Sequence, residues 1–172
     1  MRAGTGYRGL VVAVAAERLA ELLLSARHRR WAMSRGGAEW GAGHYPAMVA
    51  LHTGLLAGCA VRAVRGPVPG GGLSGSMTGV VLAAQALRWW CIATLGRRWN
   101  TRVIVVPGAP LVRRGPYRWL RHPNYLAVAV EGAALPLAGG AGGLAAAFSA
   151  ANAALLAVRI RVENRALATV SQ

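Results

Sequence analysis

The sequence predicts an all-α protein that crosses a membrane about five times, with a short extended loop or hairpin on the cytoplasmic side before the fourth helix. Two observations predict this class. Of the 172 residues, 55% are hydrophobic and only 15% are charged, whereas soluble domains carry about 25% charged residues. The apolar residues also form long blocks, and arginines gather between the blocks. The length fits one domain, so we expect a single integral-membrane domain over residues 1–172.

A transmembrane helix needs about 20 predominantly apolar residues to cross about 30 Å of hydrocarbon. The apolar blocks predict spans at about 9–26, 45–62, 76–96, 122–138 and 144–161. Pro123 suits the first turn of the fourth helix, because its missing N–H would have no partner there anyway. The segment Thr101–Val106 is rich in β-branched residues and precedes a Pro-Gly pair, which is typical of a short hairpin or an extended loop.

The net charge of +15 comes from 20 basic residues, all of them arginine, against five glutamates. Such a charge fits either nucleic-acid phosphates or the arginine-rich cytoplasmic loops of a membrane protein. Fourteen arginines fall in the first and third loops and in the tail, whereas four fall in the N-terminus and the second loop. This asymmetry predicts no nucleic-acid partner. It places the arginine-rich side, with the C-terminus, on the cytoplasmic side of the cell membrane.

Charges inside the predicted spans are costly, so each needs a partner or a function. Arg18 and Glu21 are three residues apart in the first span and are expected to pair. Arg88 of the third span is a candidate partner of Glu17. Glu131 in the fourth span has two open interpretations, which are an ion pair with another helix and a position in a cavity wall.

No metal site is predicted. His44 and His52 are eight residues apart, which is about 12 Å along a helix, and this is too far for both to bind one metal ion. Cys59 and Cys91 stand far apart inside apolar blocks, so we expect them to be buried free thiols.

The segment from Arg97 to Tyr125 is the richest in polar residues. The fourth helix is expected to begin near His122 with free backbone N–H groups, and Arg121 stands beside it. Such an end can bind an anion such as a carboxylate, although an arginine-rich loop that holds anionic lipid has the same composition. In the tail, Glu163 could hold an amine or a sulfonium, and the alternative there is a basic anchor at the membrane surface.

These motifs also carry a resemblance. The sequence Gly115-Pro-Tyr-Arg-x-x-Arg121-His-Pro-x-Tyr125 is followed by a span that ends Leu-Pro-Leu and by a tail with Arg-x-x-x-Glu. This pattern, over a core of about residues 76–170, resembles the isoprenylcysteine carboxyl methyltransferase family of multispan membrane enzymes that use S-adenosylmethionine. The N-terminal half contains Arg18-Leu-x-Glu-Leu and Gly36-Gly-x-Glu-x-Gly-x-x-His-Tyr-Pro46. It looks like the bacterial branch found beside type III polyketide synthases, which O-methylates alkylpyrones.

The resemblance implies a binding site for S-adenosyl-L-methionine at the cytoplasmic face. Its residues would be Tyr117, Arg121, His122, Pro123, Tyr125 and Glu163. Two departures weaken the transfer of the prenylcysteine substrate to this chain: Asn164 stands where the family often has a second Glu, and Ala127 stands where many members have Gly. The resemblance therefore implies methylation of a long-chain lipophilic acidic hydroxyl, such as an alkylpyrone, with a functional link to a type III polyketide synthase.

A 4-hydroxy-2-pyrone is a vinylogous acid that is largely anionic at neutral pH, so it needs an orienting cation more than a strong base. We expect Arg98, Arg102 and Glu131 as catalytic residues, and Glu39, His44 and Trp99 on the substrate side. Three alternatives remain open: carboxyl methylation of a prenylcysteine-like substrate, N-methylation of a lipid amine, and a non-enzymatic membrane adaptor that binds anionic lipid. The expected partners are a lipophilic small molecule and membrane lipid.

Overall fold

The computed structural model describes residues 2–169 of the chain. Within this part the chain forms five α-helices, one for each predicted span. They are α1 Arg2–Met33, α2 Tyr45–Arg65, α3 Gly72–Leu95, α4 Pro123–Ala138 and α5 Gly142–Ala168. The prediction of an all-α, membrane-like protein with five helices is therefore confirmed.

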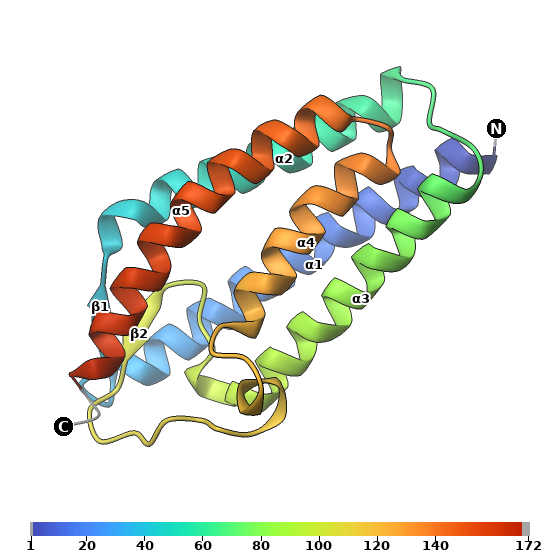
Figure 1. Cartoon of the computed structure of the whole chain (residues 1–172). Coiled ribbons are helices and arrows are strands. Elements are labelled where there is room, and N and C mark those ends of the chain that lie inside the picture. The colour runs from blue at the N-terminus through green and yellow to red at the C-terminus, as the bar shows by residue number, and fades with distance from the viewer. Residues whose placement is uncertain (1, 170–172) are drawn as a thin grey trace.

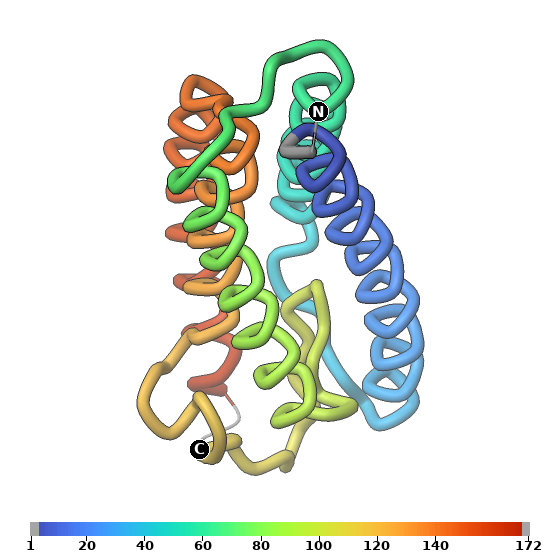
Figure 2. The backbone as a smooth tube through the Cα atoms, turned by 90° about the vertical axis from the view of Figure 1, so that its right-hand side faces the viewer, coloured from blue at the N-terminus to red at the C-terminus, as the bar shows by residue number. Residues whose placement is uncertain are grey.

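The helices run side by side along the long axis of the molecule (Figure 1). The start of α1, the α2–α3 connection and the α4–α5 turn lie at one end of this bundle. The end of α1, the start of α2, the α3–α4 connection and the end of α5 lie at the other end (Figure 2). Fourteen of the 20 arginines belong to segments at or near this second end, which we name the arginine-rich end.

Three segments are long and apolar enough to cross a membrane, by length and composition: Ala42–Arg65, Gly72–Arg98 and Gly142–Ala168. α1 has the length but carries charges in its middle. α4 has only 16 residues, which is about 24 Å of helix. It packs against both α3 and α5 and completely buries Ala127 and Leu135. Its neighbours therefore cover much of this short helix.

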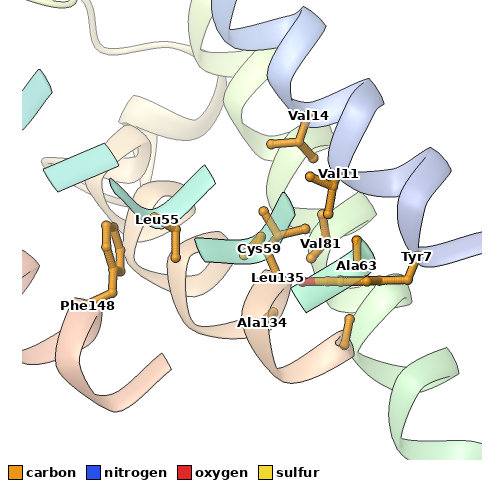
Figure 3. Close-up of a cluster of buried hydrophobic side chains, with 11 residues drawn as sticks. Tyr7, Val11, Val14, Leu55, Cys59, Ala63, Val81, Ala134, Leu135 and Phe148 are labelled. Carbon is orange, nitrogen blue, oxygen red and sulfur yellow. The ribbon is translucent and has the colours of Figure 1, made fainter. Parts of the chain in front are cut away.

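The main hydrophobic core fills the half of the bundle away from the arginine-rich end (Figure 3). Val11 of α1, Cys59 of α2 and Leu135 of α4 belong to this core. Gly132 allows α4 and α5 to approach closely, because a Cβ atom at this position would lie 2.0 Å from the ring of Phe148. The helices of this half of the bundle are therefore closely packed against one another.

Two short strands join distant parts of the chain at the arginine-rich end. β1 (Ala38–Trp40) follows α1, and β2 (Val103–Val105) follows α3. The strands pair antiparallel, with Glu39 opposite Ile104. The extended segment predicted at Thr101–Val106 is thus confirmed in its β2 portion. Its partner is a distant strand rather than the neighbouring arm of a hairpin.

Four charged side chains from three helices meet inside the bundle, and we name them the interior ion cluster. Arg18 of α1 lies 2.5 Å from Glu21 and 2.6 Å from Glu131 of α4. Arg88 of α3 lies 3.2 Å from Glu131 and 3.5 Å from Glu21. The predicted pairing of Arg18 with Glu21 is confirmed. Two positive and two negative groups face one another, which offsets the cost of keeping charges away from water.

Glu17 lies beside this cluster and has other partners. It accepts hydrogen bonds from the amide of Gln85 and from the indole of Trp89, both on α3. The expected pair of Arg88 with Glu17 is therefore wrong. The rotation of α3 about its axis turns the Arg88 guanidinium toward the two carboxylates of the cluster instead.

Candidate active site

A cavity of about 870 Å³ opens at the arginine-rich end. Its walls are the segment 97–106 after α3, the loop 109–113, the turn η3 (Gly115–Arg118) with the start of α4, and the last turns of α5. Small-molecule sites usually measure about 300–1,000 Å³. The cavity is therefore large enough for a cofactor and for the head of a second ligand.

α4 begins at this cavity with one backbone N–H group, that of Asn124, that has no partner in the described part of the chain, because Pro123 has no N–H and Tyr125 donates to the carbonyl of His122. Pro123 is its first residue, and His122 before it makes no capping hydrogen bond through its side chain. The guanidinium of Arg121 lines the cavity and has no hydrogen-bond or ion-pair partner within the described part of the chain. A helix start with a free N–H group and an unpaired arginine beside it attracts anions.

His122, Tyr125 and Glu163 form one group between α4 and α5. The rings of His122 and Tyr125 stack, with 5.4 Å between their centroids and 18° between their planes. The Tyr125 hydroxyl donates to Glu163 Oε2, and His122 Nδ1 lies 3.8 Å from Glu163 Oε1. His122 Nε2 lies 3.1 Å from Oδ1 of Asn164. Asn164 of α5 thus holds the His122 ring by a hydrogen bond at one nitrogen, and the Glu163 carboxylate lies near the other.

Arg159 of α5 extends this group and is a residue that the sequence reasoning missed. Its Nε donates to the Tyr125 hydroxyl at 2.8 Å, and its Nη1 lies 3.2 Å from the sulfur of Met48. Only 5% of the residue is exposed. The available signal was its spacing of four from Glu163, which puts both residues on one face of the helix. A buried guanidinium whose described partners include no carboxylate favours a bound anion.

Arg102, just before β2, lines another wall of the cavity. Its Nη1 lies 2.5 Å from Glu39 Oε1, and its guanidinium lies 3.9 Å from the centroid of the Tyr45 ring. Burial opposes ionisation of Glu39, but the hydrogen bond and charge of Arg102, with the charge of Arg29, outweigh burial and lower the pKa of the Glu39 carboxyl. The carboxylate therefore stays ionised and fixes the position of Arg102.

Trp99 and Arg98 line the cavity where α3 gives way to β2. Trp99 is 2% exposed, and its carbonyl oxygen lies 2.8 Å from Nδ1 of His28 in α1. Arg98 donates from Nη1 to the carbonyl of Pro110. This bond ties the loop that forms the outer wall to the end of α3.

Most of the predicted site residues meet at this cavity. Those that line it are Arg98, Trp99, Arg102, Tyr117, Arg121, His122, Tyr125 and Glu163. Pro123 starts α4 directly behind this wall, and neither Glu39 nor His44 is a lining residue. Glu131 belongs to the interior ion cluster and does not line the cavity. It therefore does not meet the two arginines that were predicted with it as catalytic residues.

The cavity is strongly electropositive. In the described part of the chain seven arginines line it, against a single carboxylate, that of Glu163. Tyr117 adds a neutral hydroxyl, because burial, followed by the nearby Cys91, Glu163 and Tyr125, raises the pKa of this group. Its hydroxyl is therefore a hydrogen-bond donor rather than a base. The cavity suits an anionic ligand better than a cationic one.

Comparison with known proteins shows the family of the segment that forms the cavity. The model of the isoprenylcysteine carboxyl methyltransferase (ICMT) family matches residues 77–169. The chain belongs to the ICMT family. All lining residues of the cavity except Ala32 fall within the matched segment. ICMT proteins are membrane methyltransferases that depend on S-adenosylmethionine, so the chain is a membrane methyltransferase by family.

The similarity to a bacterial relative also covers most of the N-terminal half. An uncharacterized protein of Bacillus subtilis (strain 168), YpbQ, is 36% identical over 159 residues. These residues make up 92% of this chain and 94% of that protein, so the similarity extends well beyond the ICMT match. No solved structure matches the chain. Among residues 4–169, no group of three or more side chains suited to a metal ion occurs.

Proposed function

We propose that this ICMT protein binds S-adenosyl-L-methionine in the cavity and methylates the acidic hydroxyl of a long-chain lipophilic molecule, such as an alkylpyrone made by a type III polyketide synthase. One observation carries the proposal: among the described residues, seven arginines and one carboxylate line a cavity at the end of an apolar helix bundle. The anionic head of such a ligand matches the arginine-rich cavity, and its long apolar tail matches the apolar helices. The arginine-rich end would face the cytoplasm, where the cofactor is supplied.

The residues at the start of α4 fit this cofactor. The unpaired guanidinium of Arg121 and the free N–H group of Asn124 in the first turn of α4 suit its carboxylate. Glu163 keeps 29% of its side chain exposed, so its carboxylate remains available to the ammonium or the sulfonium. The Tyr125 ring packs against the His122 ring and the Arg159 guanidinium, and its hydroxyl positions the Glu163 carboxylate. When bound, S-adenosylmethionine supplies an electrophilic methyl group.

The acceptor would be oriented by the arginines on the opposite part of the wall. Arg98 and Arg102 can each donate to an anionic oxygen, and Glu39 holds Arg102 in place for this task. The acceptor would be methylated as an anion, so no residue has to remove a proton from it, and Arg98 and Arg102 would only have to orient its oxygen toward the methyl group. The contribution of the chain is therefore alignment and the exclusion of water.

The charge of the wall also separates the alternative acceptors. A lipid amine must bring a neutral or positive nitrogen to a wall with seven arginines, which disfavours N-methylation. A prenylcysteine carboxylate matches the charge. Asn164 and Ala127 argue against it, because the family often has a second Glu at the first position, and many members, including prenylcysteine enzymes, have Gly at the second.

Cofactor binding tests the first part of the proposal. We expect the detergent-purified protein to bind S-adenosylmethionine in a calorimetric titration, and His122→Ala to weaken this binding at least about tenfold, which is about 1.4 kcal/mol. Arg161→Ala is the matched control, because Arg161 is exposed on α5 and does not line the cavity. Equal affinity in all three proteins would contradict the assignment of the cofactor site.

Transfer of a labelled methyl group tests the acceptor. The purified protein is incubated with labelled cofactor and with an alkyl 4-hydroxy-2-pyrone, a prenylcysteine or phosphatidylethanolamine in parallel. Label is expected in the pyrone alone. Label in the prenylcysteine or in the phospholipid would show that the acceptor is that molecule and not the pyrone, and it would still demonstrate methyltransferase activity.

A further inference from the structure

The turn η3 lies against the side of α3 rather than beyond its end (Figure 1). A Cβ atom on Gly115 would lie 2.5 Å from the Thr94 hydroxyl and 3.2 Å from the indole nitrogen of Trp90. The ring of Trp119 meets the ring of Trp90 edge-on, with 5.9 Å between centroids. Trp90 is five residues before Leu95, the end of α3, which is about 7 Å of helix. The segment after the loop therefore returns along the apolar part of α3.

The apolar side chains of this segment have little protein cover. Trp119 is 67% exposed, Trp90 is 47% exposed, and Leu120 beside Trp119 is also exposed. On α3, Leu82 and Ala86 precede Trp90 at four-residue spacing, and both are exposed. Trp119 and Leu120, directly after η3, therefore continue an exposed apolar face of α3.

Two arginines precede the exposed tryptophan in the chain. Arg114 and Arg118 are exposed, and neither guanidinium has a hydrogen-bond or ion-pair partner in the described part of the chain. The Arg118 guanidinium lies 5.9 Å from the centroid of the Trp119 ring. Indole rings concentrate where the apolar layer of a membrane meets its headgroups, and nearby arginines attract anionic headgroups by about 1 kcal/mol each.

We propose that Trp90, Trp119, Leu120, Arg114 and Arg118 form an interfacial surface that docks into the leaflet at the arginine-rich end and binds the headgroups of anionic phospholipids. The indoles and Leu120 lie in the headgroup region and the arginines bind phosphate. This inference does not depend on the identity of the methyl acceptor. Because Arg118 also lines the cavity, the same contact holds one cavity wall against the membrane.

Fluorescence quenching tests whether Trp119 lies in the lipid. The protein is placed in nanodiscs of phosphatidylcholine, with or without a share of phosphatidylcholine brominated near the headgroup end of its acyl chains. The emission of Trp119 is the difference between the wild type and Trp119→Phe. Trp40→Phe isolates a control tryptophan at the same end, which packs against the small cluster around Ala166. We expect the Trp119 emission to fall by more than half and the Trp40 emission to change little. Equal quenching of the two residues, or none at Trp119, would overturn the placement.

Retention of lipid tests the role of the arginines. The detergent-purified protein is mixed with phosphatidylglycerol or with phosphatidylcholine, and the bound lipids are counted by native mass spectrometry. The double variant Arg114→Gln/Arg118→Gln is expected to retain several-fold less phosphatidylglycerol than the wild type. The matched control is Arg161→Gln/Arg165→Gln, two exposed arginines of α5 at the same end. Equal retention by the two double variants would show that the arginines of the interfacial surface have no special part in binding.

Discussion

Arg18 of α1 reaches Glu131 of α4 inside the helix bundle, with Nη2 and Oε2 2.6 Å apart. Arg88 of α3 contacts the same carboxylate oxygen at 3.2 Å. α1 lies outside the segment that matches the family model, whereas α4 and all of α3 from residue 77 on lie within it. The interior ion cluster is thus a polar connection between α1 and the helices that carry the cavity. Because Glu131 is 6% exposed, this connection is well separated from solvent.

The first prediction concerns stability. Arg18→Gln leaves two buried carboxylates with a single guanidinium, and breaking a buried ion pair on one side costs about 3–5 kcal/mol. We expect a lower midpoint when the detergent-solubilised variant is heated and followed by circular dichroism. Arg27→Gln is the control, because Arg27 is exposed on the same helix and its side chain has no partner among residues 4–169.

A second variant separates charge balance from simple loss of contacts. Arg18→Gln/Glu131→Gln leaves Arg88 facing Glu21 alone, at 3.5 Å, so one positive group again faces one negative group. This double variant is expected to be more stable than Arg18→Gln. A loss equal to the sum of the two single variants would contradict the balance argument.

The fold was largely predictable because its signals are local. Apolar blocks of helix length, Pro123 at a helix start and the spacing of Arg18 and Glu21 depend only on neighbouring residues. Two features depend on how distant elements meet. The pairing of β1 with β2 joins segments more than 60 residues apart, and the partners of Arg88 depend on the rotation of α3. No local pattern encodes either feature.

The site divides in the same way. The residues from Tyr117 to Tyr125 are close in sequence, so a motif could indicate them together. Arg159 enters the site only because α5 packs beside α4 and brings its Nε to the Tyr125 hydroxyl. Glu131 is the opposite case. In the sequence it is a lone charge in an apolar span, which suggests a function, but in the fold it pairs with Arg18 of α1 and Arg88 of α3 inside the bundle.

Tyr125→Phe provides the second prediction. The hydroxyl donates to Glu163 and accepts from Arg159, so its removal leaves two charged groups without this partner. Hydrogen bonds to charged groups contribute about 1.5–3 kcal/mol, and we expect the affinity for S-adenosylmethionine to fall about tenfold or more. Calorimetric titration measures this. Tyr45→Phe is the control, because Tyr45 bonds Thr101 at the same end without lining the cavity. Unchanged affinity in Tyr125→Phe would rule out the network as a support of the cofactor site.

The third prediction concerns pH. Arg102 holds the pKa of the Glu39 carboxyl below its ordinary value, against the opposing effect of burial. A group whose pKa is lowered by folding contributes stability above its unfolded pKa, which is about 4.3 for glutamate, and loses that contribution as the pH falls through the lowered value. Near neutral pH, the melting temperature of the wild type should therefore exceed that of Glu39→Gln by a constant difference. The difference should shrink below about pH 4.3. A difference in melting temperature that stays constant or grows on acidification would contradict the ion pair of Arg102 with Glu39.

The last prediction concerns orientation. The bias of arginines toward one end predicts that this end faces the cytoplasm. Single cysteines can report it, because the native Cys59 and Cys91 are both buried and should react little. In intact cells a membrane-impermeant maleimide is expected to label Gly70→Cys, in the α2–α3 connection, and to label Arg113→Cys only after the membrane is permeabilised. The reverse pattern would put the cavity on the outer face, where a cytoplasmic supply of S-adenosylmethionine could not reach it. The orientation test therefore also bears on the proposed methyl transfer, without requiring knowledge of the acceptor.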